Sequence, residues 1–553
     1  MLALNGKQIG GDLSNLGCQQ RTISGLLRFL VWRSTLRSNH DRSGLALAGV
    51  ILLAASLRLH QVDQPYVDEF AWRQADTASI AEAFARGNWN ILLPQVRWGG
   101  PGPNFIGAEF QLVTGLAALG YHLFGPEAWV GRAVSVAFSL WGIFALYNLV
   151  LRVWDRPRAI ATAAVIAVLP GAVFTDRSFL PDGAMTALMT TSLWMLVVFH
   201  QTDRSRYLWA AALFGALGCL TKLPGGILLI PALYVFMAWL GKHRGDRRAQ
   251  LRLATAVVTA TLPVVLYYLW ARHVALSNPP YHFTGEDKFL WHSGVRAWMQ
   301  NGYFLPDLWQ IVASRDAYWG YGFIAFAIGG LAVSLRLRSL SPLPWLFHYW
   351  LLAMMIRYAV EAQHLIADPY NLHLFHTPVA AFAGHALVSF NTWLGARERR
   401  ASWLPTLGFA ASAIAAQMQA GHLYHDSYRQ HAALGTAIAA MSSPGDLVVS
   451  AGPEPVVLYF SKRNGWLFPP AEGRSARLFE QPAYWDRAEG DGARLRELRY
   501  RGARWLAIPA WNAYTGIADQ AFLRQTYPVL YEAVWREFEV VHSSEAGLIL
   551  RTR

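Results

Sequence analysis

The stretch LALAGVILLAASLRLH at residues 45–60 is followed almost at once by PYVDEFAWRQADTASIAEAFARGNW at residues 65–89. The first stretch is apolar and nearly as long as the roughly 17–25 residues that a helix needs to cross a bilayer. The second places Asp68 and Glu69 side by side where that helix would leave the membrane. Charged groups at this depth cost free energy and are commonly functional. The junction therefore indicates a membrane protein with a polar site at one face.

The composition of the whole chain agrees with a membrane protein. Of its 553 residues, 54% are hydrophobic and 15% are charged, against about 25% charged in soluble domains. The net charge is +13, but the basic residues cluster in short loops between apolar segments, so membrane topology explains them and we expect no nucleic-acid partner. Cys18 and Cys219 have neither disulfide nor metal-site spacing.

Apolar segments recur along most of the chain. A stretch at 105–125 is interrupted by Glu109 and Gln111, so we interpret it as an interfacial helix rather than a span. The predicted fold class is a polytopic α-helical membrane protein with about 11 transmembrane helices. The eleven candidate spans lie at 44–60, 128–150, 159–176, 183–200, 207–222, 223–240, 253–271, 318–335, 342–358, 372–394 and 402–419.

Arginine and lysine residues mark one side of these segments. They are dense in the N-terminal arm, residues 1–43, and in alternate short loops such as 242–252. If eleven helices alternate, every basic loop falls on one side, which the positive-inside rule assigns to the cytoplasm. The membrane domain is then residues 44–419, and the segments on the outer face are 61–127, 272–317 and 420–553.

The segment 420–553 reads as a soluble domain on the outer face. Strand-like runs are separated by helical stretches such as 484–502, an alternation that favours a small α/β domain. The four predicted strands are DLVVSAG (446–452), VVLYFS (456–461), RWLAIPA (504–510) and AGLILRTR (546–553).

Two acidic sites fall on the outer face. A carboxylate of the Asp68–Glu69 pair could act as a general base, bind a metal or orient a sugar; the alternative is a solvated interfacial pair. Asp182 follows Pro181 at the start of a helix, so it could instead cap that helix. Arg177 precedes it on the same side. Acidic groups that converge here could divide the roles of base and positioning.

Basic and aromatic residues accompany these acids. Lys222, in CLTKLPGG, lies between two apolar stretches and suits a lipid phosphate, although it could snorkel to the interface. The stretch EAQHLIADPYNLHLFHTP (361–378) contains His373 and His376 at a spacing that zinc could use. Contacts with a donor head group fit this stretch better, through His364, Tyr370 and Asn371.

Motifs for soluble nucleotide chemistry are absent from the sequence. It contains no Walker A loop, no glycine-rich dinucleotide fingerprint, no G-x-S-x-G elbow and no H-E-x-x-H motif. Nucleotide sugars are generally not found outside the cytoplasm. A sugar donor used at the outer face would therefore be carried by the membrane.

Together these residues resemble the membrane glycosyltransferases of the GT-C fold, in particular the family 39-like group of aminoarabinose transferases and protein O-mannosyltransferases. The Asp68-Glu69 pair after the first span fits this family. Arg177 and Asp182 fit its second motif, and Thr221-Lys222 fits the motif before Pro-Gly. The resemblance covers about residues 44–420. It departs at YNLHLF, where relatives often have a tyrosine pair followed by Leu-Pro.

The resemblance implies inverting transfer from a polyprenyl-phosphate sugar to an envelope glycan, lipid or protein, in a bacterial inner membrane with the C-terminal domain periplasmic. By analogy Asp68 is the base, Glu69 and Asp182 position the acceptor or sugar, and Lys222 with Arg177 or Arg73 stabilises the phosphate. Outer-loop residues that would contact the acceptor or support the site are Trp72, Gln74, Asp76 and Glu109.

The sequence also bears on metal binding and on functions other than sugar transfer. We assign no metal ligands, while leaving a divalent cation possible, and membrane lipid is an expected partner. A transporter or flippase is the main alternative, but we find no inverted repeat with broken helices in the sequence. A catalytically inactive scaffold is a third hypothesis, against which the intact Asp68, Asp182 and Lys222 argue.

Overall fold

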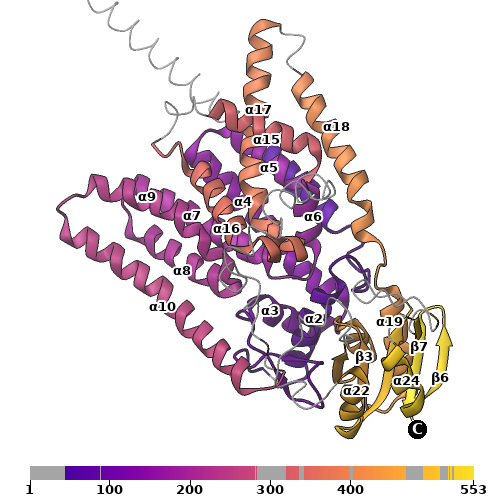
Figure 1. Cartoon of the computed structure of the whole chain (residues 1–553). Helices are drawn as coiled ribbons and strands as arrows, with labels where there is room; N and C mark the ends of the chain where they lie inside the picture. Colours follow the sequence, from indigo (N-terminus) through magenta and orange to yellow (C-terminus); the bar gives the residue numbers. More distant parts are fainter. Residues whose placement is uncertain are drawn as a thin grey trace, which may run out of the picture.

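The structure is a computed structural model of the chain. It describes residues 44–87, 89–280, 282, 319–334, 342–398, 403–468, 490–510, 521, 524–525 and 528–553. The N-terminal arm, residues 1–43, and most of the segment 272–317 therefore lie outside the described residues. The described residues form a helical bundle joined to a small sheet domain (Figure 1).

Each of the eleven apolar segments contains a helix. Four of these helices are long and apolar enough to cross a membrane, or five if the bent pair α5–α6 is one span; this covers only the described part of the chain. The number of spans thus stays a prediction. The helices are Gly44–Arg58, α4 (Ala128–Val153), α5 (Arg156–Val168), α6 (Pro170–Arg177), α7 (Asp182–Thr202), α8 (Ser205–Thr221), α9 (Leu229–Lys242), α10 (Arg247–Ser277), α15 (Tyr321–Ser334), α16 (Leu346–Ala367), α17 (His373–Arg397) and α18 (Leu404–Gln419).

The helices differ in how much apolar surface they bury. α7 packs against α4 and α8, and most of its length is buried. α10 packs on α8 at the edge of the bundle and leaves Leu262, Leu266 and Leu269 more than half exposed. Apolar surface of this extent is stable against lipid, not water. α7 is therefore the central helix of the bundle and α10 a lipid-facing one.

A bend brings polar residues to one end of the bundle. α5 and α6 meet at 64° where Leu169 is followed by Pro170, and a proline at this point cannot continue the hydrogen-bond ladder of the preceding helix. The bend places α6 against the first residues of α7. The first turn of α7 consequently lies close to Asp176, next to Gly183.

The segment 61–127 folds as a compact unit of short elements. It contains α2 (Ala71–Ala85), a small antiparallel pair formed by β1 (Gln95–Val96) and β2 (Asn104–Phe105), and α3 (Leu112–Phe124). The stretch that we interpret as interfacial forms the 13-residue α3, which is shorter than a span.

The C-terminal segment is a mixed α/β domain, as predicted. Its sheet has the strand order β4-β3-β5-β7-β6, with β3 parallel to β4 and β5 and with β7 antiparallel to β5 and β6. The elements are α19 (Arg429–Met441), β3 (Leu447–Ala451), α20 (Val456–Ser461), β4 (Gly465–Phe468), α22 (Gly490–Tyr500), β5 (Ala503–Pro509), α24 (Pro528–Glu537), β6 (Phe538–Ser544) and β7 (Gly547–Thr552).

One predicted strand is wrong. VVLYFS forms the helix α20, and the strand beside β3 is β4. Parallel strands cannot be joined by a tight hairpin and need a crossover, usually helical. Pro455 lies immediately before this helix, which is the crossover between β3 and β4.

The sheet domain and the segment 61–127 are joined through their backbones. Gly99 and Gly100 both donate from N–H to the carbonyl of Gly465 at 2.8 Å, and the Gly465 N–H donates to the carbonyl of Arg97. The β4 edge of the sheet is thereby covered by the WGG loop, residues 98–100. Figure 1 shows α2 and α3 beside the sheet domain.

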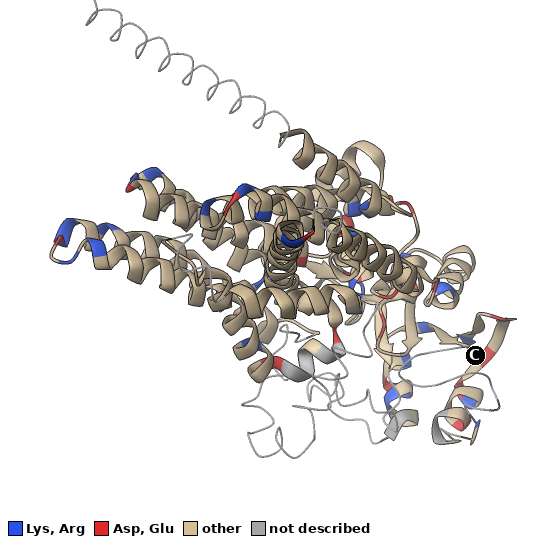
Figure 2. Ribbon diagram, turned by 90° about the horizontal axis from the view of Figure 1, so that it is seen from above, with Lys and Arg blue, Asp and Glu red and all other residues tan. Residues whose placement is uncertain are grey.

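Charge is unevenly distributed over the bundle. Basic residues gather at the turn between α9 and α10, far from the sheet domain (Figure 2). This separation is what the predicted orientation requires, with the basic turn and the sheet domain on opposite sides of the membrane.

Candidate active site

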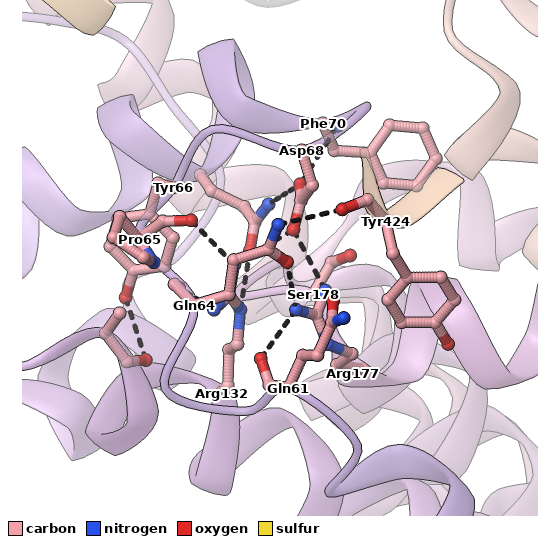
Figure 3. Close-up of polar contacts among 12 residues, drawn as sticks. Gln61, Gln64, Pro65, Tyr66, Asp68, Phe70, Arg132, Arg177, Ser178 and Tyr424 are labelled. Atoms are coloured by element: carbon pink, nitrogen blue, oxygen red, sulfur yellow. Dashed lines mark hydrogen bonds and ion pairs between the residues drawn. The ribbon is translucent and has the colours of Figure 1, made fainter. Parts of the chain in front are cut away.

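Asp68 is the centre of a buried ion-pair cluster (Figure 3). Its side chain has no exposed surface, and Oδ2 accepts from Arg132 Nη2 and from Arg177 Nη1, each at 2.9 Å. Oδ1 accepts from Gln74 Nε2 at 2.6 Å and from the Phe70 N–H at 3.3 Å. The carboxylate therefore joins the loop after the first helix to α4 and α6.

This position differs from the accessible carboxylate that the sequence leads us to expect. A general base must reach the proton that it removes, whereas both oxygens of Asp68 are enclosed by their donors. In this arrangement Asp68 connects the loop to α4 and α6 through Arg132 and Arg177, and its role as a base stays a prediction.

Arg177 and Gln74 also have positions that fit support better than substrate binding. Arg177 is completely buried, and besides Asp68 it donates to the carbonyls of His60 and Gln61 and to Gln64 Oε1. Gln74 Oε1 accepts from Arg132 Nε at 3.3 Å and from the Phe179 N–H at 3.1 Å. The phosphate role considered for Arg177 stays a prediction.

Lys222, Asp182 and Asn371 meet in a second cluster. Lys222 Nζ lies 2.7 Å from Asp182 Oδ1 and 2.8 Å from Asn371 Oδ1, and 4.8 Å from the centre of the Tyr370 ring. Asp182 does not cap α7 with its side chain, because Oδ1 accepts from Lys222 and Oδ2 accepts no hydrogen bond from the described residues. Residues that lie 40 and 149 positions from Lys222 in the sequence thus form one site with it.

Two buried atoms of this cluster lack partners. Among the described residues, neither Asp182 Oδ2 nor Asn371 Nδ2 has a hydrogen bond, although both are buried. Buried polar atoms are normally paired. Their orphaned state beside Lys222 indicates that this cluster accommodates a polar group from outside the chain.

The segment 61–127 contributes an ion pair and a further carboxylate. Arg73, on α2, pairs with Glu109, which precedes α3, and both side chains are nearly buried. Trp72 lies on the same helix, with its ring 6.4 Å from that of Tyr370. Asp76 Oδ1 accepts from Trp98 Nε1 at 2.9 Å.

The electrostatics of Arg73 connect these groups. Burial opposes its charge, yet Glu109, Tyr370, Asp76 and Asp182 together raise its pKa above the ordinary value. Arg73 therefore lies within the field of both the outer-loop carboxylates and the Lys222 cluster. The chain segments that carry Glu109 and Lys222 are also in direct contact. The N–H of Phe110, the residue after Glu109, donates to the carbonyl of Leu220 at 2.9 Å.

Two further site residues predicted from the sequence are Glu69 and His364. Glu69 is partly exposed, unlike Asp68, and its N–H donates to the carbonyl of Leu423 at 3.2 Å. His364 belongs to α16, but its side chain lies outside the described residues.

Both ring nitrogens of His373 contact protein side chains. Its Nε2 lies 2.7 Å from Asp176 Oδ1, and its Nδ1 lies 2.8 Å from Thr186 Oγ1. Asp176 also pairs with Arg58 at 2.9 Å. In the described part of the chain, no group of three His, Cys, Asp or Glu side chains is placed to hold a metal ion.

Sequence reasoning missed two arginines of the buried network. Arg58 lies near the end of the first apolar segment and Arg132 within the second, and both are completely buried. An arginine inside an apolar segment needs a partner at the same depth. That signal is present in the sequence, although it does not identify Asp176 and Asp68 as the partners.

An apolar groove is lined by residues that neighbour Lys222 in the chain. It lies between α7, α8, α9 and α10, has a volume of about 270 Å³, and reaches Cys219 and Leu223, on either side of Lys222 in the chain. Its lining is almost entirely apolar and includes Met189, Leu193, Leu208, Phe236 and Val257. The groove suits a hydrocarbon chain.

A helical membrane bundle, with buried charged clusters at the end that bears a mixed sheet domain, defines the class of GT-C membrane glycosyltransferases. The model of the family described as dolichyl-phosphate-mannose-protein mannosyltransferase matches residues 112–272, which include Asp182 and Lys222. With this match and this fold, the chain is identified as a glycosyltransferase of the GT-C class, as the sequence resemblance predicts.

Solved structures share the fold at low sequence identity. ArnT from Cupriavidus metallidurans bound to undecaprenyl phosphate is similar with a TM-score of 0.60 and 14% identity, over 91% of this chain and 97% of that chain. The Archaeoglobus fulgidus oligosaccharyltransferase, in complex with Zn and sulfate, gives 0.55 and 12%, over 91% of this chain and 73% of that one. No curated protein matches the sequence itself.

Proposed function

We propose that this protein transfers a sugar, with inversion, from a polyprenyl-phosphate donor to an acceptor at the outer face of a bacterial inner membrane. The observation that carries the proposal is the position of Lys222, held between Asp182 and Asn371. A donor of this class has a charged phosphate next to a long hydrocarbon chain. Lys222 offers the cation, and the apolar groove that reaches Cys219 and Leu223, its neighbours in the chain, offers an apolar lining.

The phosphate would bind at the open side of the Lys222 cluster. An ammonium has three N–H donors, of which two are directed to Asp182 and Asn371. The third, with the orphaned Asn371 Nδ2, would donate to phosphate oxygens. As the bond between the sugar and the phosphate breaks, the charge that develops on the leaving phosphate is stabilised by Lys222.

Arg73 is the second cation that we assign to the donor side. Its guanidinium already pairs with Glu109, and the carboxylate of Asp182 contributes to its raised pKa. It can therefore stabilise a phosphate without leaving Glu109 unpaired. The Tyr370 ring, 4.8 Å from Lys222 Nζ and 6.4 Å from the Trp72 ring, would lie beside the donor head group.

The acceptor side faces the outer loop and the sheet domain. A hydroxyl or amine on a lipid, glycan or protein would attack the anomeric carbon opposite the phosphate. Glu69, Asp182 and Glu109 are the carboxylates that we assign to positioning the acceptor or the sugar. A divalent cation could assist by binding phosphate oxygens.

Transfer from a labelled donor tests the proposal. Purified protein in detergent would receive polyprenyl-phosphate sugars and a crude envelope fraction, and new glycosidic product would be measured. Lys222→Gln should lower the rate by about 100-fold or more, because a buried charge that stabilises the transition state is lost. Lys242→Gln, at an exposed basic residue of the α9–α10 turn, is the matched control. Undiminished transfer by Lys222→Gln would refute the assigned donor site.

A further inference from the structure

The Lys222 site depends on the relative position of two separate elements. Asp182 is the first residue of α7, and Asn371 belongs to η4 (Pro369–Leu372), the short 3-10 helix before α17. Lys222 Nζ donates to both side chains, at 2.7 and 2.8 Å. A change in the spacing between α7 and η4 would therefore break at least one of these contacts.

His373 joins α7 to the same region of the chain. It is the first residue of α17, two positions after Asn371, and its Nδ1 lies 2.8 Å from the hydroxyl oxygen of Thr186. Thr186 follows Asp182 by four residues on α7, so the two side chains lie on one face of that helix. The His373–Thr186 contact is thus a second bridge between α7 and the start of α17, beside the one through Lys222.

Asp176 fixes the orientation of the histidine ring. His373 Nε2 lies 2.7 Å from Asp176 Oδ1. A carboxylate only accepts hydrogen bonds, so Nε2 donates its hydrogen, and in the neutral ring Nδ1 accepts from the Thr186 hydroxyl. Asp176 itself accepts from Arg58 at 2.9 Å and from Ser139 at 2.7 Å, and all of these side chains are buried. The ring orientation is therefore set by a network that extends to the first helix and to α4.

A separate contact holds η4 against α16. Arg357 of α16 is 2% exposed and donates from Nη1 to the carbonyl of Asn371 at 2.8 Å. This contact fixes the backbone of Asn371 and leaves its side-chain oxygen to Lys222. Arg357 thus fixes η4 against α16, and His373 fixes the turn that follows against α6 and α7.

Binding of the donor would make the second bridge more important. A phosphate beside Lys222 is negatively charged and would repel the nearby carboxylate of Asp182. Attraction of Lys222 toward the phosphate would also weaken its contacts with Asp182 and Asn371. The His373–Thr186 hydrogen bond does not pass through Lys222, so it can keep α7 and η4 at their spacing while the donor binds.

We propose that His373 is a positioning residue of the donor site, an inference that rests on the proposed function. Its ring, oriented by Asp176, accepts the Thr186 hydroxyl and keeps Asp182 at the distance from Asn371 that Lys222 requires. Neither His373 nor Thr186 needs to touch the donor. Their effect is on the affinity for the phosphate, because a binding group must be held within about 0.5 Å of its productive position.

Thr186→Val is the first test, because valine keeps the branched shape and loses the hydroxyl. The dissociation constant of undecaprenyl phosphate, measured on the full-length protein in detergent, should rise about fivefold, as expected for the loss of one hydrogen bond. Thr186→Ser keeps the hydroxyl and should bind like wild type. Thr191→Val is the matched control, since Thr191 is buried on the same helix and its hydroxyl donates to the Ala187 carbonyl of that helix at 2.7 Å.

His373→Gln is the second test. The glutamine amide can still donate to Asp176 but has no acceptor in the place of Nδ1, so the affinity should fall as in Thr186→Val. Because the two substitutions break one contact, the double variant should bind no more weakly than either single variant. Fully additive losses would overturn the inference.

Steady-state transfer separates positioning from folding. Partial unfolding lowers the apparent kcat and leaves the KM for the donor unchanged, whereas a displaced phosphate site should raise that KM about fivefold. If wild type binds undecaprenyl phosphate and Thr186→Val binds it equally well, the inference fails and the proposed function stands. A wild-type protein that neither binds undecaprenyl phosphate nor transfers a sugar from it would overturn the proposed function and the inference with it.

Discussion

Three guanidinium groups, those of Arg58, Arg132 and Arg177, are completely buried beside two carboxylates, Asp68 and Asp176. Burying charge is unfavourable unless the charges are paired and hydrogen-bonded. Each of these carboxylates binds more than one cationic or polar group, so removing either carboxylate would leave several buried groups unpaired. Their effect on stability should therefore exceed that of an isolated surface pair.

Asp68→Asn should destabilise the protein strongly. The substitution removes the charge that Arg132 and Arg177 share, and breaking a buried pair costs about 3–5 kcal/mol. Thermal unfolding in detergent measures the effect, with the exposed Asp63→Asn as control. Equal melting temperatures for the two variants would contradict a supporting role for Asp68.

His431 should make the protein sensitive to acid. It is buried in the sheet domain, and burial lowers its pKa to about 4. Because the unfolded chain binds a proton near pH 6.5 and the folded chain does not, stability falls as the pH decreases from about 6.5 toward 4. The expected loss between pH 7 and pH 5 is about 2 kcal/mol. His431→Gln should flatten the dependence of stability on pH, and His425→Gln, at an exposed histidine, should not. If the melting temperatures of wild type and both variants change with pH in the same way, His431 is not the source of the acid sensitivity.

Individual site residues were partly accessible to sequence reasoning. Lys222 and Asp182 could be singled out because charges beside apolar segments are costly, and the structure brings the two together. The partner of a buried arginine could not be identified in this way. Arg58 and Asp176 are 118 positions apart, and only the packing of the helices brings them into contact.

At the scale of elements, the broken helix α5–α6 and the crossover helix α20 are the informative features. Pro170 marks the break, and a proline inside an apolar segment is a readable signal. VVLYFS carries no such signal, because a short, mostly apolar run fits a strand or a buried helix equally well. Only the parallel pairing of β3 with β4 requires a crossover there.

Gly465→Ala should loosen the sheet domain from the segment 61–127. A Cβ at this position would overlap with the Val448 carbonyl oxygen, so β4 could not keep its place. We expect faster proteolysis of the domain and reduced transfer. Gly421→Ala is the matched control, since a Cβ there meets nothing within 4 Å. If both variants resist protease like wild type, the junction does not depend on this close approach.

At the scale of the whole molecule, the sheet domain and the basic α9–α10 turn lie far apart (Figure 2). A reporter enzyme that works only outside the cytoplasm should be active when fused after Arg553 and inactive when fused within the turn at Gly245. This follows from the positive-inside rule and an odd number of spans. Activity at both positions, or at Gly245 alone, would contradict the predicted orientation.

The hydrogen bonds between the WGG loop and Gly465 have a consequence for biosynthesis. The ribosome releases Trp98 long before Gly465, so the early loop is made without the strand edge that later receives it. The junction between the WGG loop and β4 is thus completed only when the last part of the chain has been made. Nascent chains arrested before β3 should therefore insert into the membrane yet form no product.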